Sequence, residues 1–201
     1  MNNREDTEIH IKNTAKKIFF SMGRLHAKTQ EIADEAKVNR ALLHYYFRNR
    51  DNLFEIVLKE ALDESHKAFF KIIASTDDFE LKISEIVSHM LERTLKYPFM
   101  ETFFVSEMMQ SPEKLLMMPS VSGSELDTRK KFKEDINDYI LKYDLPHKNS
   151  QHFIANLFAM CVYPSVAKPL LMNLFQFDEK DFKNFIEERK LVITKLLLGK
   201  K

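Results

Sequence analysis

The chain has 201 residues, of which 44% are hydrophobic and 30% charged, a composition typical of a globular protein and not of a disordered one. Three glycines and six prolines argue against sandwiches and barrels, and one cysteine, Cys161, excludes an internal disulfide framework. The net charge is +1, but residues 1–50 carry +4 (ten Lys/Arg against six Asp/Glu) and the rest −3. This asymmetry weakly indicates an anionic partner for the N-terminal region, and ordinary fluctuation explains it equally well.

Apolar residues recur at helical spacing, and no window alternates as a strand does. We predict an all-α protein of about nine helices. The first helix ends at Gly23, and two short helices follow with Thr29 and Asn39 as N-caps. The fourth helix begins near residues 49–51 and the fifth near 77–78. Four more helices cover roughly 99–110, 124–143, 150–168 and 179–198. Pro164 is expected to kink the helix that contains it.

The segment from Thr29 to Phe47 holds two short helices joined by the turn 36–39. This is the spacing of a helix-turn-helix, whose second helix enters the DNA major groove. Around it, residues 9–62 resemble the DNA-binding region of the TetR family of bacterial transcriptional regulators. The resemblance runs in order through Ala15, Phe19, Gly23, Thr29, Ile32, Ala33, Val38, Leu43, Tyr46, Phe47, Leu53 and Phe54.

Three positions depart from the family pattern. Lys37 stands where a turn glycine is usual, which predicts a left-handed backbone at a cost of ~1 kcal/mol. Asn39 stands where Ser or Thr is usual and can cap as well, and His44 stands where Tyr is usual. The resemblance implies a DNA-binding domain over residues 1–50 and a ligand-binding and dimerisation domain over 51–201.

Within the motif, Arg40 is the best candidate for reading a base, because a guanidinium pairs bidentately with O6 and N7 of guanine. Ala41 and Leu42 are suited to a thymine methyl group, and Thr29 at a helix N-terminus is suited to a phosphate. Leu43 and Phe47 are expected to anchor the helix in the core. The other predicted DNA contacts, several of them carried over from matching family positions, are Lys28, Gln30, Asn39, His44, Tyr45, Tyr46, Arg48 and Arg50.

The segment 99–119 holds three Phe and five Met, and methionine is common at adaptable apolar binding surfaces. The resemblance implies a small-molecule pocket among the middle helices, and an apolar effector fits this composition. The candidate lining residues are His89, Phe103, Phe104, Met108 and Met109. Ordinary core packing is the alternative for each of them.

The last two predicted helices carry apolar stripes at 3–4 spacing, and the resemblance implies a homodimer through them. The alternative is that these stripes face only the core of their own chain. The candidate interface residues are Phe153, Leu157, Met160, Phe182, Phe185, Ile186, Arg189, Ile193 and Leu196.

We therefore expect a ligand-responsive DNA-binding regulator, most often a repressor in this family, that binds a palindromic operator as a dimer and is released by a small apolar molecule. The alternative is a helical interaction protein that keeps the fold without specific DNA binding. An enzyme is not expected, because no phosphate-binding Gly loop, GxSxG, HExxH or paired-cysteine motif is present. We expect no cofactor or metal. The sequence has no signal peptide and no stretch near ~18 uncharged apolar residues. We therefore expect the protein in the cytoplasm, at the nucleoid.

Overall fold

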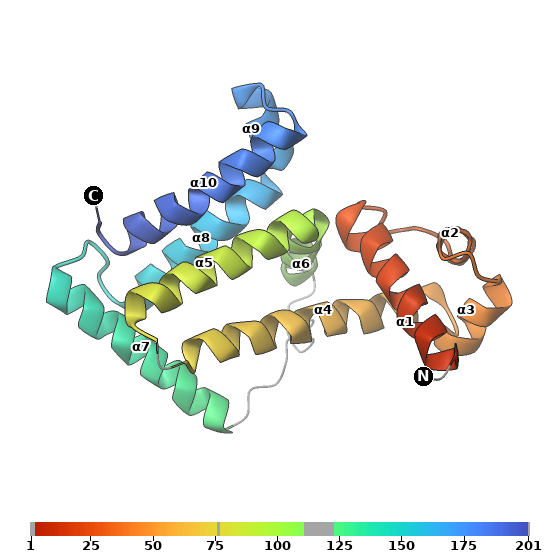
Figure 1. Ribbon diagram of the computed structural model, residues 1–201, viewed down its shortest axis with the longest axis horizontal. Helices are drawn as coiled ribbons and strands as arrows, with labels where there is room; N and C mark the ends of the chain where they lie inside the picture. The colour runs from red at the N-terminus through yellow and green to blue at the C-terminus, as the bar shows by residue number, and fades with distance from the viewer. Residues whose placement is uncertain (1–2, 76, 111–122, 201) are drawn as a thin grey trace. The chain divides into compact units, whose positions relative to one another are not determined.

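The structure, a computed structural model, describes residues 3–75, 77–110 and 123–200, and every regular element among them is helical (Figure 1). This confirms the predicted all-α fold class. The described α-helices are α1 Asn3–Lys16, α2 Thr29–Glu35, α3 Arg40–Phe47, α4 Arg50–Ile73, α5 Phe79–Lys96, α6 Pro98–Gln110, α7 Gly123–Tyr143, α8 Ser150–Val166, α9 Lys168–Phe175 and α10 Glu179–Leu197.

The chain packs as two compact units. Unit 1 comprises Met1–Ser65 and Tyr97–Pro119, and unit 2 comprises His66–Lys96 and Ser120–Lys201. Unit 1 thus contains α6 and most of α4 besides the first three helices. A functional division at residue 50 stays a prediction.

Unit 1 has an aromatic core. Phe54 on α4 lies at its centre, with the ring centroid of Phe19 at 5.0 Å and that of Phe103 on α6 at 4.9 Å. A π-helical turn, Lys17–Ser21, follows α1 and brings Ile18, Phe19 and Phe20 into the core in succession, each with 0% exposure. Three consecutive buried side chains do not fit the regular α-helical face that the periodicity predicts, and the wider turn accommodates them.

Unit 2 is built on α5, α8 and α10, which pack against one another, with α7 against α5 and α8 (Figure 1). Its core includes Ile83, Phe153 and Ile193 from these three helices, all with 0% exposure. Burying one side chain of this size contributes about 1.5–3 kcal/mol. The apolar stripes of α8 and α10 therefore stabilise unit 2 itself.

The helix that follows α8 was not predicted, whereas α8 itself agrees with the helix predicted over roughly 150–168. α8 stops at Val166, and a separate helix, α9, begins at Lys168 after a 72° bend. Pro169, the second residue of α9, cannot donate a backbone hydrogen bond to the preceding turn and restricts the residue before it. The chain therefore turns at Ala167 and has one helix more than expected among its described residues.

Pro164 lies inside α8, and α8 continues through it. A proline leaves the carbonyl four residues earlier without its helical donor. Here that carbonyl, on Met160, accepts a hydrogen bond from Nη2 of Arg189 on α10 at 3.2 Å. The contact explains how a proline is tolerated in a buried helix.

Within the described ranges, no single helix is both long and apolar enough to cross a membrane. Only α8 and α9 taken together reach that length and composition, and they are the pair bent by 72°.

Candidate nucleic-acid interface

The turn between α2 and α3 is fixed by backbone and side-chain hydrogen bonds. Lys37 has the predicted left-handed conformation, with φ 53°. The Val38 N–H donates to the Ala33 carbonyl at 2.9 Å, which closes the end of α2. Asn39 caps α3 as predicted, because its Oδ1 accepts from the backbone N–H of Ala41 at 2.8 Å. The turn therefore sets the start of α3 without a glycine.

The start of α2 differs from the prediction that Thr29 is its N-cap. Lys28 occupies the cap position with an extended backbone, and its N–H donates to Oε2 of Glu31 at 2.7 Å. Thr29 is the first helical residue. This hydrogen bond from Lys28 is the largest cause that holds the pKa of Glu31 below its usual range, and Arg24 forms an ion pair with the same carboxylate.

α3 is anchored on one side and open on the other. Leu43 and Phe47 are buried in the core of unit 1, as predicted, with 0% and 1% exposure. Residues one turn apart share a helix face, so the opposite face points outward. That reading face, as we name it, consists of Arg40, Ala41, His44, Tyr45 and Arg48, all of them exposed.

The reading face has donors that are not consumed within the protein. The guanidinium of Arg40 has no hydrogen-bond or ion-pair partner in the described part of the chain. Tyr45 is 66% exposed, whereas Tyr46 is half-buried beside it with the ring centroids 5.2 Å apart. Leu42 is also half-buried. Arg40 and Tyr45 are therefore more accessible to DNA than Leu42 and Tyr46.

Two of the other predicted DNA contacts, Gln30 and Arg50, interact with residues of the protein itself. Gln30 is exposed, but its Nε2 donates to Oδ1 of Asp34 at 2.7 Å. Arg50 at the start of α4 pairs with Oδ1 of Asp51 at 2.8 Å, and its guanidinium lies 5.2 Å from the Phe19 ring centroid and 4.9 Å from that of Phe54. Arg50 thus stabilises unit 1 as well as offering a charge.

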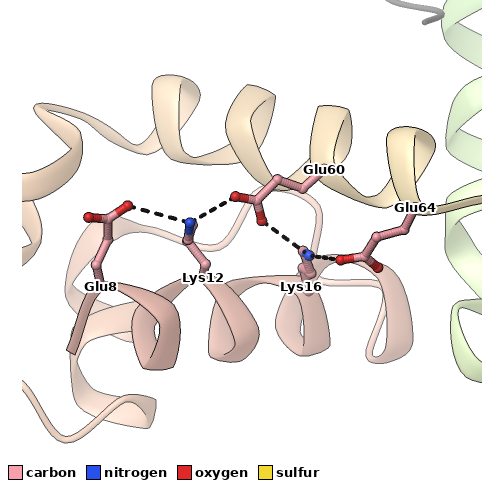
Figure 2. Close-up of polar contacts among 5 residues, drawn as sticks. All are labelled: Glu8, Lys12, Lys16, Glu60 and Glu64. Carbon is pink, nitrogen blue, oxygen red and sulfur yellow. Dashed lines mark hydrogen bonds and ion pairs between the residues drawn. The ribbon is translucent and has the colours of Figure 1, made fainter. Parts of the chain in front are cut away.

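A charge network between α1 and α4 was not predicted (Figure 2). Nζ of Lys12 lies 2.8 Å from Oε1 of Glu60, and Nζ of Lys16 lies 3.2 Å from the other oxygen of Glu60 and 3.1 Å from Glu64. Glu8 completes it at 3.4 Å from Lys12. The signal that could have found it is two lysines and two glutamates, each pair four residues apart on its helix.

The network keeps its charges at neutral pH. Burial alone would lower the pKa of Lys16, which is 6% exposed, but hydrogen bonds to Glu64 and Glu60 outweigh burial and raise it. For Glu60, burial acts to raise the pKa, and hydrogen bonds from Lys12 and Lys16 hold it below the ordinary value of 4.5. The network thereby fastens α1 to α4.

The predicted ligand residues fall in both units. His89 is on α5 in unit 2, and Phe103 and Phe104 are on α6 in unit 1, half-buried against the core. Met109 is 81% exposed, and the side chain of Met108 lies outside the described residues. Membership of a shared pocket stays a prediction.

The predicted dimer residues mostly point inward. Five of them are core residues of unit 2 with at most 4% exposure, namely Phe153, Leu157, Phe182, Ile186 and Ile193. Met160, Phe185 and Arg189 are half-buried, and Leu196 is 59% exposed. In this fold the five core residues are not available to a second copy.

The same helices expose other apolar residues. Phe158 on α8 is 46% exposed, and Ala155 and Ala159 beside it are exposed. On α10, Leu191 and Val192 are 62% and 46% exposed. We call these five residues together with Leu196 the α8–α10 face.

The environment of Cys161 disfavours the reactive thiolate form of its side chain. Burial raises the pKa of its thiol to about 12, against the lowering effect of Arg189, so it is protonated at neutral pH. Across residues 3–75, 77–110 and 123–200, no three His, Cys, Asp or Glu side chains are grouped to hold a metal ion.

The part of the chain that contains the helix-turn-helix matches a known protein family. Residues 11–57 match the family described as "Bacterial regulatory proteins, tetR family". The HTH-type transcriptional repressor NicS of Pseudomonas putida KT2440 is 26% identical over 101 residues, 50% of this chain and 48% of that protein. The match thus spans about half the length of this curated relative.

Solved structures share the fold over nearly the whole chain. A TetR/AcrR-family regulator from Thermobifida fusca YX-ER1 has a TM-score of 0.60 at 17% identity, covering 96% of this chain and 97% of that one. A TetR variant from Acinetobacter baumannii AYE in complex with minocycline has a TM-score of 0.51 at 14% identity, covering 94% and 93%. At these identities the likeness concerns the fold.

Proposed function

We propose that this chain is a TetR-family transcriptional regulator and that it binds a palindromic DNA operator as a homodimer through the reading face of α3. The observation that carries the proposal is the free guanidinium of Arg40 on the open side of a helix whose other side is buried. Arg40 would read guanine, and Ala41 would contact a thymine methyl group.

Phosphate contacts would supply most of the affinity and the register on the duplex. Lys28 is exposed just before α2 and Arg48 just after α3, and Tyr45 is exposed on α3 itself. Thr29, Gln30, Asn39, His44, Tyr46 and Arg50 remain proposed contacts at positions that match the family. Because Arg50 is packed against Phe19 and Phe54, its contribution to DNA binding is coupled to the stability of unit 1.

For the dimer, we propose the α8–α10 face in place of the buried residues predicted from the stripes. Small Ala155 and Ala159 beside Phe158 would let two helices approach closely, and Leu191 and Leu196 supply apolar area. A two-fold dimer presents two reading helices to half-sites one or more DNA turns (~34 Å) apart, which is why the operator is expected to be palindromic.

Regulation would follow from a small apolar molecule bound among the middle helices. A structure of the same fold holds minocycline, which supports a small-molecule effector of some kind. A ligand that favours a dimer with wrongly spaced reading helices would release DNA, and DNA would weaken ligand binding by the same factor. Since the curated relative is a repressor, repression in the cytoplasm, at the nucleoid, is the proposed outcome.

The alternative, a helical interaction protein that has lost DNA binding, makes an opposite prediction for duplex affinity. Fluorescence anisotropy with a labelled random-sequence duplex at two salt concentrations separates the two. A regulator binds the duplex, with affinity that falls steeply as salt rises, because phosphate neutralisation releases counterions. An interaction protein shows no duplex binding at either concentration.

A further inference from the structure

Unit 2 contains a cavity whose described lining includes none of the residues predicted above to contact DNA, a ligand or a second copy. It has a volume of about 610 Å³ and is lined by Ala74, Ser75 and Asp77 after α4, by Phe79 and Lys82 in the first turn of α5, and by one face of α7. Pockets that bind small molecules commonly have volumes of ~300–1,000 Å³. The size alone therefore allows a ligand, and the lining decides which kind.

A buried cation lies at this cavity. Lys82 on α5 is 8% exposed, and its Nζ donates to the carbonyl of Ile73, the last residue of α4, at 3.4 Å. An ammonium group has three donors, and this single long contact is the one hydrogen bond described for it. Ser75 also lines the cavity, and its buried Oγ has no partner among the described residues. Both groups thus keep donors that no described acceptor takes up, and a ligand or water in the cavity has to supply the acceptors.

The walls have both apolar and charged surface. Phe79 and Tyr139 line the cavity with ring centroids 4.6 Å apart. Lys131, Asp135, Asp138 and Lys142 line it from α7, where spacings of four, three and four residues place them on one face. With Lys82 and Asp77, the lining has three lysines and three aspartates. A simple anion would meet the aspartates, whereas a molecule with both charges would match the lining.

We propose that this cavity binds a small aromatic zwitterion of the amino-acid class. Its carboxylate lies at Lys82 and Ser75, its ring against Phe79 and Tyr139, and its ammonium group at Asp135 and Asp138. The site does not depend on the proposed DNA binding, because its occupancy is measured without DNA.

The test is isothermal titration of the full chain with three probes. L-phenylalanine has both charges, benzoate has the carboxylate alone and phenethylamine the ammonium alone. We expect saturable binding of L-phenylalanine, at least about tenfold tighter than either single-charge probe, since one charge-assisted hydrogen bond is worth about that factor. No saturable binding of L-phenylalanine, or equal binding of a single-charge probe, would overturn the proposal.

Variants assign the two ends of the ligand. Lys82→Met should weaken L-phenylalanine about tenfold or more, whereas Lys133→Met, an exposed residue of α7 outside the lining, should leave it unchanged. Asp135→Asn removes a half-buried carboxylate without touching Lys82; it should weaken L-phenylalanine and leave benzoate unchanged or tighter. If Lys82→Met does not fold, Asp135→Asn still tests the proposal. Unchanged L-phenylalanine affinity in Asp135→Asn, or in a folded Lys82→Met, would contradict the assignment.

Discussion

At the residue scale, Lys37 carries backbone strain that glycine would avoid. Its φ of 53° lies in the left-handed region, and the position is exposed at the end of α2. A residue with a Cβ has roughly 1–2 kcal/mol less stability there than in the right-handed region, and glycine does not. The turn before the reading helix is therefore held by its hydrogen bonds against the preference of its own residue.

We predict that Lys37→Gly raises the free energy of unfolding by about 1 kcal/mol, because the glycine adopts the positive φ without steric conflict. Urea denaturation followed by circular dichroism measures it. Lys37→Ala is the matched control, since it removes the same side chain and keeps the Cβ, and it should show no such gain. Equal stability of all three proteins would mean that position 37 is unstrained.

Arg40 and Lys28 should separate specificity from general affinity. Arg40→Ala should cost ~1–3 kcal/mol on the operator and little on random DNA, because a guanine contact is lost. Lys28→Ala should weaken operator and random DNA alike and reduce the salt dependence, because a phosphate contact is lost. Competitive anisotropy measures both variants. An Arg40→Ala protein that still discriminates as well as the wild type would remove Arg40 from base reading.

At the element scale, α1 and α4 are joined by the network of Lys12, Lys16, Glu60 and Glu64. Because the folded pKa of Glu60 lies below its ordinary value, its contribution is complete above about pH 4.5 and is lost as pH falls through the folded pKa. The pKa values of Lys12 and Lys16 are raised above 10.5, so their contribution is complete below about pH 10.5 and is lost as pH rises further. The network therefore fastens α1 to α4 fully between about pH 4.5 and 10.5.

Glu60→Gln should lower the free energy of unfolding at pH 7 by about 1 kcal/mol, a value kept small because the Glu60 side chain is partly exposed. The difference from the wild type should shrink towards zero at an acidic pH below the folded pKa of Glu60, where both side chains are neutral. Glu55→Gln, an exposed residue of the same helix, is the control and should change little at either pH. A difference that is the same at both pH values would show that the charge of Glu60 does not contribute.

The sequence could predict the elements whose signals are local. Asn39 caps α3 through its own backbone neighbour, and α5 ends before Pro98 because proline restricts the residue before it. The division into α8 and α9 was missed although Pro169 marks it, because the apolar pattern continues across the bend. The Lys12–Glu60 contact joins residues far apart in the sequence, so it depends on tertiary packing that periodicity does not contain.

The dimer residues show a second limit of periodicity. A 3–4 stripe identifies an apolar helix face but does not tell whether that face meets the protein's own core or another chain. Both α8 and α10 are apolar on two sides: Phe153 and Ile193 have 0% exposure, whereas Phe158 and Leu191 are exposed. The packing of α5 against both helices decides which side is inside.

At the scale of the whole molecule, the proposed dimer depends on the α8–α10 face. Charging it by Phe158→Glu or Leu191→Glu should give a monomer, because a carboxylate would be buried without a partner. Light scattering measures the mass. Leu141→Glu on α7 is the control, since Leu141 is 80% exposed and lies off this face, and it should remain dimeric. Dimers that survive both charge substitutions would place the interface elsewhere.

The proposal that this protein recognises a specific DNA sequence is tested by a gel shift. Purified protein is mixed with the DNA upstream of its own gene, near physiological salt, with excess shuffled competitor. We expect a discrete complex that survives the competitor and is lost with Arg40→Ala. A complex removed by the competitor, or no complex even after refolding from denaturant to strip a bound ligand, would contradict it.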